Sequence, residues 1–345
     1  MPQQQKNNHA AKQSQPGLFK GIPTRALLLW VLLLPTGATA SPGPFENSYF
    51  VTIEGVELHF RHWVPDPVHQ KGSCLLIHGF SGSTFSWEGV AQRMQQLGFE
   101  VVALDIPPFG YSDKSARVNK SVTGLASLVL DFLDELFPGQ AWHLAGHSMG
   151  GAIAQAMGLM RPEAFHTVTL VAPAAFSRTR AATNDKDGQA AHPPTSIETG
   201  RTGRILGSWP LRHIVGRLAE RYFITPRRVR RLLASALGEQ PSQEQVAAYS
   251  EPLRLRGTAA AILSSGRNSQ EVAGLDAADM QVPTLAVWGD GDQWVPYESR
   301  RQVVEKIPGV DVQLIPGAGH NPMETHPEEF LAIWAGFLQA VLGQE

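Results

Sequence analysis

At Gly146-His147-Ser148-Met149-Gly150-Gly151 the chain has a serine with one glycine two residues before it and another two residues after it. An apolar run, 141–145, precedes this stretch, and a helix-prone run, 152–157, follows it. A strand, a tight turn and a helix with serine at the apex are typical of a nucleophile elbow, in which the glycines relieve crowding around an outward-facing hydroxyl. The pattern also fits an ordinary small-residue turn, so the rest of the chain must decide between the two.

Apolar runs of strand length alternate with helical stretches along most of the chain. The runs are 49–53, 56–60, 74–77, 101–105, 142–145, 167–171, 284–288 and 312–315. The first two flank Glu54-Gly55 and predict a β-hairpin. Helical stretches at 87–97 and 327–342 are among those that separate or follow the other runs. This alternation predicts an α/β fold with a mostly parallel eight-stranded sheet and helices on both faces.

The alternation stops between 174 and 280, a gap far longer than the roughly 4–6 residues of an ordinary connection. Its first part, 178–203, is rich in Thr, Gly, Pro and charged residues and predicts a mobile loop. Its later part, 206–237 and 242–265, predicts helices that form a lid over the strand ends, where open α/β sheets bind ligands. The predicted organisation is a core of 41–175 and 281–345 with a lid insertion at 176–280.

The N-terminal region has the features of a secretory signal peptide. A polar, basic segment precedes the apolar run 26–34, and Ala38-Thr39-Ala40 has the small residues of a cleavage site before Ser41. The apolar run is shorter than the roughly 20 residues that span a bilayer. We therefore predict a signal peptide at 1–40 and a secreted or periplasmic protein. The alternative is an uncleaved membrane anchor, because the polar segment is longer than usual.

Charge and cysteine content exclude several classes of function. Residues 1–40 contain four of the 29 lysines and arginines and no acidic residue, so the remainder has 25 basic residues against 31 acidic ones. A formal charge of −6 gives no electrostatic drive towards nucleic acid. The single cysteine, Cys74, lies in an apolar run, so one chain can form neither a disulfide nor a cysteine-based metal site. No metal site is expected.

A serine nucleophile requires a base and an orienting carboxylate later in the chain. His320 follows the last predicted strand in a glycine-rich loop, Gly317-Ala318-Gly319-His320, and is the best placed of the 12 histidines. Two carboxylates, Asp290 and Asp292, follow the preceding strand. We select Asp292 as the orienting acid, because Asp290 stands closer to the strand, where aspartate often caps a turn.

An oxyanion hole requires two backbone donors near the serine. The N–H of Met149, at the start of the predicted helix, is one candidate. The second is the N–H of Phe80 in His78-Gly79-Phe80, where glycine lets the backbone approach a substrate. We interpret His78 as a residue that packs this loop, because no partner with metal-ligand spacing accompanies it.

Five segments in this order resemble the α/β-hydrolase superfamily over residues 48–342. They are His78-Gly79, 105–112, 146–151, 289–296 and 317–322. The resemblance implies a triad of Ser148, Asp292 and His320, an acyl-serine intermediate and no cofactor. The lid and the serine at the elbow are similar to a group that includes carboxylesterases, meta-cleavage-product C–C hydrolases and cofactor-free haloperoxidases.

The sequence therefore predicts a serine hydrolase that cleaves a small, apolar carboxylic ester. One alternative is hydrolysis of a C–C bond on the same scaffold. Another is a ligand-binding protein without catalysis, although no member of the implied triad is missing.

The predicted lid is strongly basic, with nine arginines against the single acid Glu220 between positions 201 and 231. A basic helical stretch of this kind contacts anionic lipid or an acidic substrate, or forms a solvated face paired with acids elsewhere. We therefore consider a membrane-surface contact as a second role for the lid.

Overall fold

The computed structural model of the chain describes residues 43–115, 117–176, 216–265 and 274–343. The predicted signal peptide, 1–40, and the loop expected near 178–203 lie outside these residues. Within the described part of the chain, no helix has both the length and the apolar character needed to cross a bilayer.

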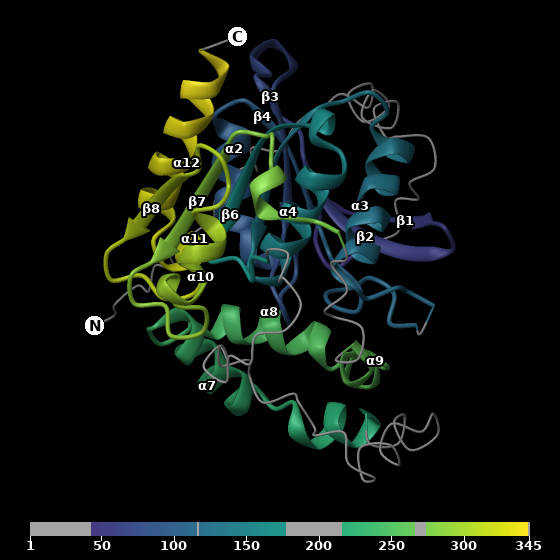
Figure 1. Cartoon of the computed structure of the whole chain (residues 1–345). Helices are drawn as coiled ribbons and strands as arrows, with labels where there is room; N and C mark the ends of the chain where they lie inside the picture. The colour runs from purple at the N-terminus through teal and green to yellow at the C-terminus, as the bar shows by residue number, and fades with distance from the viewer. Residues whose placement is uncertain (1–42, 116, 177–215, 266–273, 344–345) are drawn as a thin grey trace, which may run out of the picture. The chain divides into compact units, whose positions relative to one another are not determined.

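Eight strands form one sheet in the order β1-β2-β4-β3-β5-β6-β7-β8 (Figure 1). Their bounds are β1 Ser48–Ile53, β2 Val56–Trp63, β3 Gly72–Ile77, β4 Phe99–Leu104, β5 Trp142–His147, β6 Phe165–Val171, β7 Thr284–Gly289 and β8 Asp311–Ile315. β2 is antiparallel to β1 and to β4, and all other neighbouring strands are parallel. This confirms the predicted α/β fold with a mostly parallel eight-stranded sheet.

The hairpin of β1 and β2 turns at Glu54 and Gly55. Ile53 pairs with Val56, and both turn residues have positive φ angles, 48° and 75°. A two-residue turn with both φ angles positive matches the twist of the flanking strands, and glycine adopts it without steric cost.

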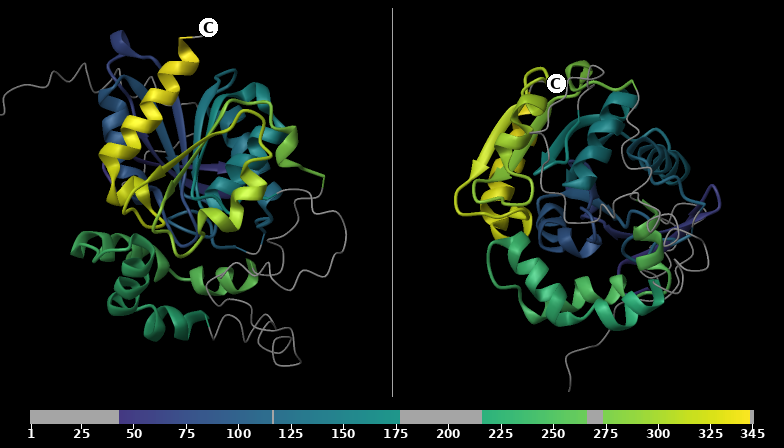
Figure 2. Two further views of the ribbon diagram at one scale, coloured as in Figure 1. Left: turned by 60° about the vertical axis from the view of Figure 1, so that its left-hand side comes forward. Right: turned by 60° about the horizontal axis from the view of Figure 1, so that its bottom comes forward.

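Helices cover both faces of the sheet, as expected. They are α2 Glu88–Gln96, α3 Val122–Leu136, α4 Met149–Met160, α10 Tyr297–Val304, α11 Pro322–Thr325 and α12 Pro327–Leu342, with short 3₁₀ turns η1 Pro67–His69, η2 Thr84–Trp87, η3 Pro162–Ala164 and η5 Ala277–Asp279. In the left view of Figure 2, the yellow α12 lies on one side of the sheet and the teal helices lie on the other.

Residues of β3 alternate between two apolar cores because successive side chains of a strand point to opposite faces. Leu75 and Ile77 join the core with residues of α3 and α4, whereas Cys74 and Leu76 join the core with residues of α2 and α12. All four side chains are fully buried. Burial raises the pKa of the Cys74 thiol well above its ordinary value.

The segment between β6 and β7 contains the inserted helices. After a helical stretch at 216–218, the described part comprises a π-helical turn, Ala219–Phe223, and the helices α7 Pro226–Leu237, α8 Gln243–Leu253 and α9 Thr258–Ser265. The expected helix that ends at 237 is interrupted at Thr225, whose side chain accepts the Arg228 N–H and begins α7. Figure 1 shows α7, α8 and α9 together at one end of the sheet.

Candidate active site

Ser148 occupies a strained turn between β5 and α4, as the glycine pattern predicts. Its φ angle is 51° and its ψ angle is −113°, a region that costs a non-glycine residue about 1–3 kcal/mol. The flanking glycines make this turn sterically feasible. A β-carbon on Gly146 would lie 2.2 Å from the Gly150 carbonyl oxygen, and one on Gly150 would lie 2.4 Å from the Ile77 carbonyl oxygen. The elbow therefore packs directly against the end of β3.

The structure brings His320 and Asp292 together. His320 Nδ1 lies 2.7 Å from Asp292 Oδ2, and both residues are buried. The other oxygen of Asp292 accepts the backbone N–H groups of Trp294, at 2.8 Å, and Val295, at 3.0 Å. Burial alone would raise the pKa of Asp292, but the His320 hydrogen bond and charge and these N–H groups lower it overall. An ionised Asp292 accepts the Nδ1 proton of His320 and leaves Nε2 of that ring as the nitrogen available to act as a base.

Asp290 has a different partner. Its Oδ1 accepts the Gly317 N–H at 2.7 Å, which joins the loop after β7 to the loop after β8. Of the two carboxylates that the sequence offers, the geometry pairs Asp292 with the imidazole and gives Asp290 a role in the turn.

The hydroxyl of Ser148 makes no hydrogen bond to any group within the described residues, and the residue is 9% exposed. Catalytic hydrogen bonds are often long or misaligned without substrate and shorten when substrate binds. The contact between nucleophile and base is thus the part of the predicted triad that this structure does not contain.

Two backbone donors stand at the elbow without a partner among the described groups. They are the N–H of Met149, at the first position of α4, and the N–H of Phe80. The Phe80 loop lies close to the serine, since a β-carbon on Gly79 would be 3.1 Å from the Ser148 β-carbon. Unpaired N–H groups at such a place are suited to stabilise a negatively charged oxygen.

His78 holds the Phe80 loop in position, as the sequence indicated. Its Nδ1 donates to the Gly79 carbonyl at 2.7 Å, and its Nε2 accepts the Ile106 N–H at 2.9 Å. Burial lowers the pKa of His78, which favours the neutral ring that this donor and acceptor pattern requires. Within the described part of the chain, no group of three His, Cys, Asp or Glu residues is arranged to hold a metal ion.

Residues 68–326 match the serine aminopeptidase S33 family, which is three quarters of the chain. The chain belongs to this family. It is an α/β hydrolase, as the sequence predicted. A hydrolase of Bacillus subtilis named YugF, whose function is uncharacterised, is 27% identical over 80% of this chain and 92% of its own length.

Two further proteins are similar to this hydrolase. A monoacylglycerol lipase of Mycolicibacterium smegmatis is 28% identical over 82% of this chain and 92% of its own length. A solved membrane phospholipase A, a bacterial virulence factor, has a TM-score of 0.64 at 22% identity and covers 92% of this chain and 91% of its own. At that identity the structural likeness supports the fold alone.

His147 is a residue of this hydrolase's site that the sequence did not single out. Its Nε2–H donates to the His320 carbonyl oxygen at 2.9 Å, and the two rings have centroids 4.7 Å apart. Burial, together with the charge of nearby His320, lowers the pKa of His147 to about 3. His147 is therefore neutral and fixes the backbone of the neighbouring base.

Helix α7 of the insertion contacts the loops that carry the acid and the base. The His320 N–H donates to the Ala236 carbonyl oxygen at 2.7 Å, and Trp294 Nε1 donates to Ser235 Oγ at 3.1 Å. The Trp294 ring stacks on His320 with a centroid separation of 5.8 Å and an interplanar angle of 20°. A β-carbon on Gly319 would lie 2.5 Å from the Leu237 carbonyl oxygen. These contacts fix the base loop against the insertion.

Helix α8 is joined to the same region through the partly buried carboxyl group of Glu324. Glu324 Oε1 accepts the Tyr249 hydroxyl at 2.5 Å and the Asn321 side-chain amide at 2.7 Å. The Ser86 hydroxyl lies 2.9 Å from the Tyr249 oxygen. Burial raises the pKa of Glu324 to about 7 despite these hydrogen bonds. No feature of the sequence at position 324 predicts a carboxyl group shielded from solvent, because the shielding depends on contacts with Tyr249 of α8.

Proposed function

We propose that this α/β hydrolase cleaves carboxylic esters through an acyl-serine intermediate. The observation that carries the proposal is the 2.7 Å hydrogen bond between His320 and Asp292, beside a serine in a strained elbow with two unpaired N–H groups. A base, an orienting acid and two donors around a serine are the groups that acyl transfer requires.

Each residue has a defined role in the proposed reaction. Ser148 Oγ attacks the ester carbonyl while His320 Nε2 takes the hydroxyl proton, and Asp292 stabilises the imidazolium that forms. The N–H groups of Phe80 and Met149 stabilise the oxyanion of the tetrahedral intermediate. His320 then returns its proton to the leaving alcohol, and the same base activates water to release the acid.

An apolar substrate fits the side chains next to the oxyanion donors. The Phe80 side chain is 38% exposed, and its ring contacts Phe109 edge-on at a centroid separation of 4.9 Å. Exposed aromatic surface beside a reacting centre favours an apolar acyl or alcohol group. The similarity to a monoacylglycerol lipase also favours an ester of an apolar acid.

A series of p-nitrophenyl esters from acetate to palmitate tests the proposal, with Ser148→Ala as the comparison. We expect turnover by the wild type, loss of activity by about three orders of magnitude or more in Ser148→Ala, and labelling of Ser148 by a fluorophosphonate. The chain length that gives the highest kcat/KM measures the size of the pocket.

Two contrasting substrates separate ester hydrolysis from the alternatives. An aminoacyl p-nitroanilide tests peptidase activity, and a meta-cleavage product of the dienone type tests C–C hydrolysis. If either is turned over much faster than every ester, the ester assignment is wrong. If folded wild type acts on none of them and is not labelled by the fluorophosphonate, a ligand-binding role without catalysis replaces it.

We also propose that residues 1–40 direct export and are removed before Ser41. This proposal rests on the polar, apolar and small-residue order of that segment. N-terminal sequencing of the exported protein is expected to begin at Ser41. An intact N-terminus in the membrane fraction would instead identify the segment as an anchor.

A further inference from the structure

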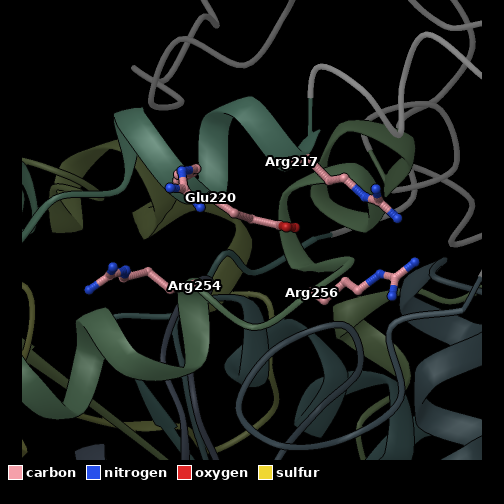
Figure 3. Close-up of a pocket in the computed structure, with 5 residues that line it drawn as sticks. Arg217, Glu220, Arg254 and Arg256 are labelled. Carbon is pink, nitrogen blue, oxygen red and sulfur yellow. The ribbon is translucent and has the colours of Figure 1, made fainter.

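A pocket lies in the insertion, and none of the candidate catalytic residues lines it. It has a volume of about 390 Å³ and is lined by Arg217, Glu220, Arg221, Arg254 and Arg256. Two walls form it: the helical stretch 216–223 and the segment after α8. Figure 3 shows Arg217 and Arg256 on one side of the pocket, Arg254 on the other side, and the Glu220 side chain between them. A volume of this size holds a small ligand or the polar part of a larger one.

Glu220 joins the two walls and does not neutralise the arginines by a direct contact. It is 7% exposed, and its Oε1 accepts the backbone N–H groups of Gly257, at 2.9 Å, and Ala259, at 3.1 Å. These donors lie at the start of α9, where a carboxylate is favoured by the helix dipole. Glu220 thereby fixes the pocket's shape, and the four guanidinium groups leave a net positive charge.

The four pocket arginines differ from the other arginines of the described chain that have acidic partners. The paired ones are Arg61 with Glu88, Arg93 with Glu328, Arg161 with Asp134, and Arg301 with Glu298 and Glu305. Within the described residues, no carboxylate oxygen lies within 4 Å of a pocket guanidinium. Like charges held together repel one another, so a bound anion would stabilise the arrangement. Planar guanidinium groups with several donors are particularly suited to phosphate oxygens.

Exposed apolar side chains accompany these charges on the same helical stretch. Leu218 is 49% exposed and Tyr222 is 59% exposed, and each follows a pocket arginine directly in sequence. Leu218 and Tyr222 are four residues apart, as are Arg217 and Arg221, so each pair recurs after about one helical turn. An apolar face beside a basic one on the same helical stretch is typical of elements that lie at a lipid surface. This combination favours a phosphate carried by a lipid over a phosphate free in solution.

We propose that this pocket binds the phosphate group of an anionic phospholipid at a membrane surface. The arginines contact the headgroup oxygens, while Leu218 and Tyr222 contact the region between headgroups and acyl chains. This inference does not depend on the proposed ester hydrolysis, since a Ser148→Ala variant retains the whole pocket.

Cosedimentation with vesicles tests the proposal, using the full chain so that residues 1–40 contribute equally to every variant. The vesicles are phosphatidylcholine alone and phosphatidylcholine mixed with phosphatidylglycerol. The test variant is Arg217→Gln/Arg256→Gln, and a second one is Arg221→Gln/Arg254→Gln. The matched control, Arg227→Gln/Arg231→Gln, removes the same charge from exposed positions of α7 outside the pocket. Thermal unfolding checks that each variant is folded.

We expect the wild type to bind the mixed vesicles in preference to phosphatidylcholine. Each pocket variant is expected to lose about tenfold or more of this affinity, and the control less than about threefold. Equal losses in the pocket variants and the control would overturn the proposal in favour of a diffuse charge effect.

A soluble ligand is the other outcome that would overturn it. Calorimetry with inorganic phosphate and with glycerol 3-phosphate measures binding in the absence of lipid. Tight binding that Arg217→Gln/Arg256→Gln abolishes, without any preference for the mixed vesicles, would assign the pocket to a soluble phosphate.

Discussion

The two ends of the helical insertion differ in their polar contacts. At the α7 and α8 end, polar contacts connect the insertion to the loops of Asp292 and His320 through Ser235, Ala236 and Glu324. At the other end, four arginines line an open pocket without acidic partners among the described residues. One insertion can therefore serve catalysis at one end and binding at the other. Changes at the α7 end are expected to alter turnover, and changes at the arginine end to alter affinity for anionic surfaces.

The largest expected effect is at Asp292. This acid accepts the Trp294 N–H, and the Trp294 indole in turn donates to Ser235 of α7. Asp292→Asn removes the charge that orients His320, and kcat is expected to fall by about 10⁴-fold, as for the equivalent change in other serine hydrolases. The control is Asp290→Asn, which weakens only the hydrogen bond to Gly317 and is expected to retain most of the activity. Steady-state kinetics on the best p-nitrophenyl ester measure both variants. Similar activity in the two would remove Asp292 from the proposed mechanism.

A methyl group between α7 and the base loop tests whether their contact matters. In Gly319→Ala the new β-carbon would lie 2.5 Å from the Leu237 carbonyl oxygen, so either α7 or His320 must shift. Small displacements of catalytic groups cost up to about 100-fold, and we expect kcat to fall by about 10- to 100-fold. The matched control is Gly336→Ala in α12, where a β-carbon meets nothing within 4 Å. Unchanged kcat in folded Gly319→Ala would show that the contact between α7 and the base loop does not affect turnover, so that the α7 end would not differ from the arginine end in its effect on catalysis.

The partly buried carboxyl group of Glu324, beside α8, predicts a pH dependence of stability. Burial raises the pKa of Glu324 to about 7, above its ordinary value of 4.5. The folded protein then binds this proton more tightly than the unfolded chain, so the contribution to stability is complete below pH 4.5 and is lost as the pH rises through 7. The wild type is expected to have a lower free energy of unfolding at mildly alkaline pH than at acidic pH. In Glu324→Gln this difference is expected to be smaller by about 1–3 kcal/mol.

Denaturant unfolding at several pH values measures this effect. Glu328→Gln, an exposed position on α12, is the control and is expected to keep the wild-type pH dependence. The lowered pKa of His147 acts in the opposite direction, because protonation of the unfolded chain destabilises the fold as the pH falls below 6.5. This contribution is common to wild type and both variants. The same pH dependence in Glu324→Gln and wild type would contradict the assignment.

The smallest expected effect is at the hydroxyl that α7 presents to Trp294. Ser235→Ala removes the 3.1 Å hydrogen bond to the indole that stacks on His320. A hydrogen bond of this kind contributes about 1 kcal/mol, so kcat is expected to fall by about two- to fivefold with little change in KM. Ser235→Thr, which keeps a hydroxyl, is expected to recover most of the loss. A change in KM alone would assign Ser235 to substrate binding instead.

The strands and the elbow follow from local patterns, whereas the supporting contacts do not. Apolar runs predict the eight strands because burial on both faces imposes a nearly continuous apolar sequence. Ser148 and His320 each follow a strand in a glycine-containing loop. Their order along the chain, serine before histidine, is the order of nucleophile and base in α/β hydrolases. The choice between Asp290 and Asp292 requires the geometry, because both follow the same strand.

The residues that support the base were missed for physical reasons. Ala236 acts through its carbonyl oxygen, a group that every residue has. His147 occupies a variable position of the glycine-serine motif, and Glu324 is acidic in a helical stretch, a pattern typical of a solvent-facing residue. Each depends on tertiary packing that brings distant segments together.

The buried thiol of β3 has a practical consequence. Cys74 is the single cysteine of the chain, it is fully buried, and burial holds its thiol in the neutral, unreactive form. A cysteine introduced at Arg256 or at exposed Leu263 of α9 would therefore react alone with a maleimide dye or a nitroxide. Fluorescence or electron spin resonance could then follow the insertion at one chosen point, in a protein that keeps its native core.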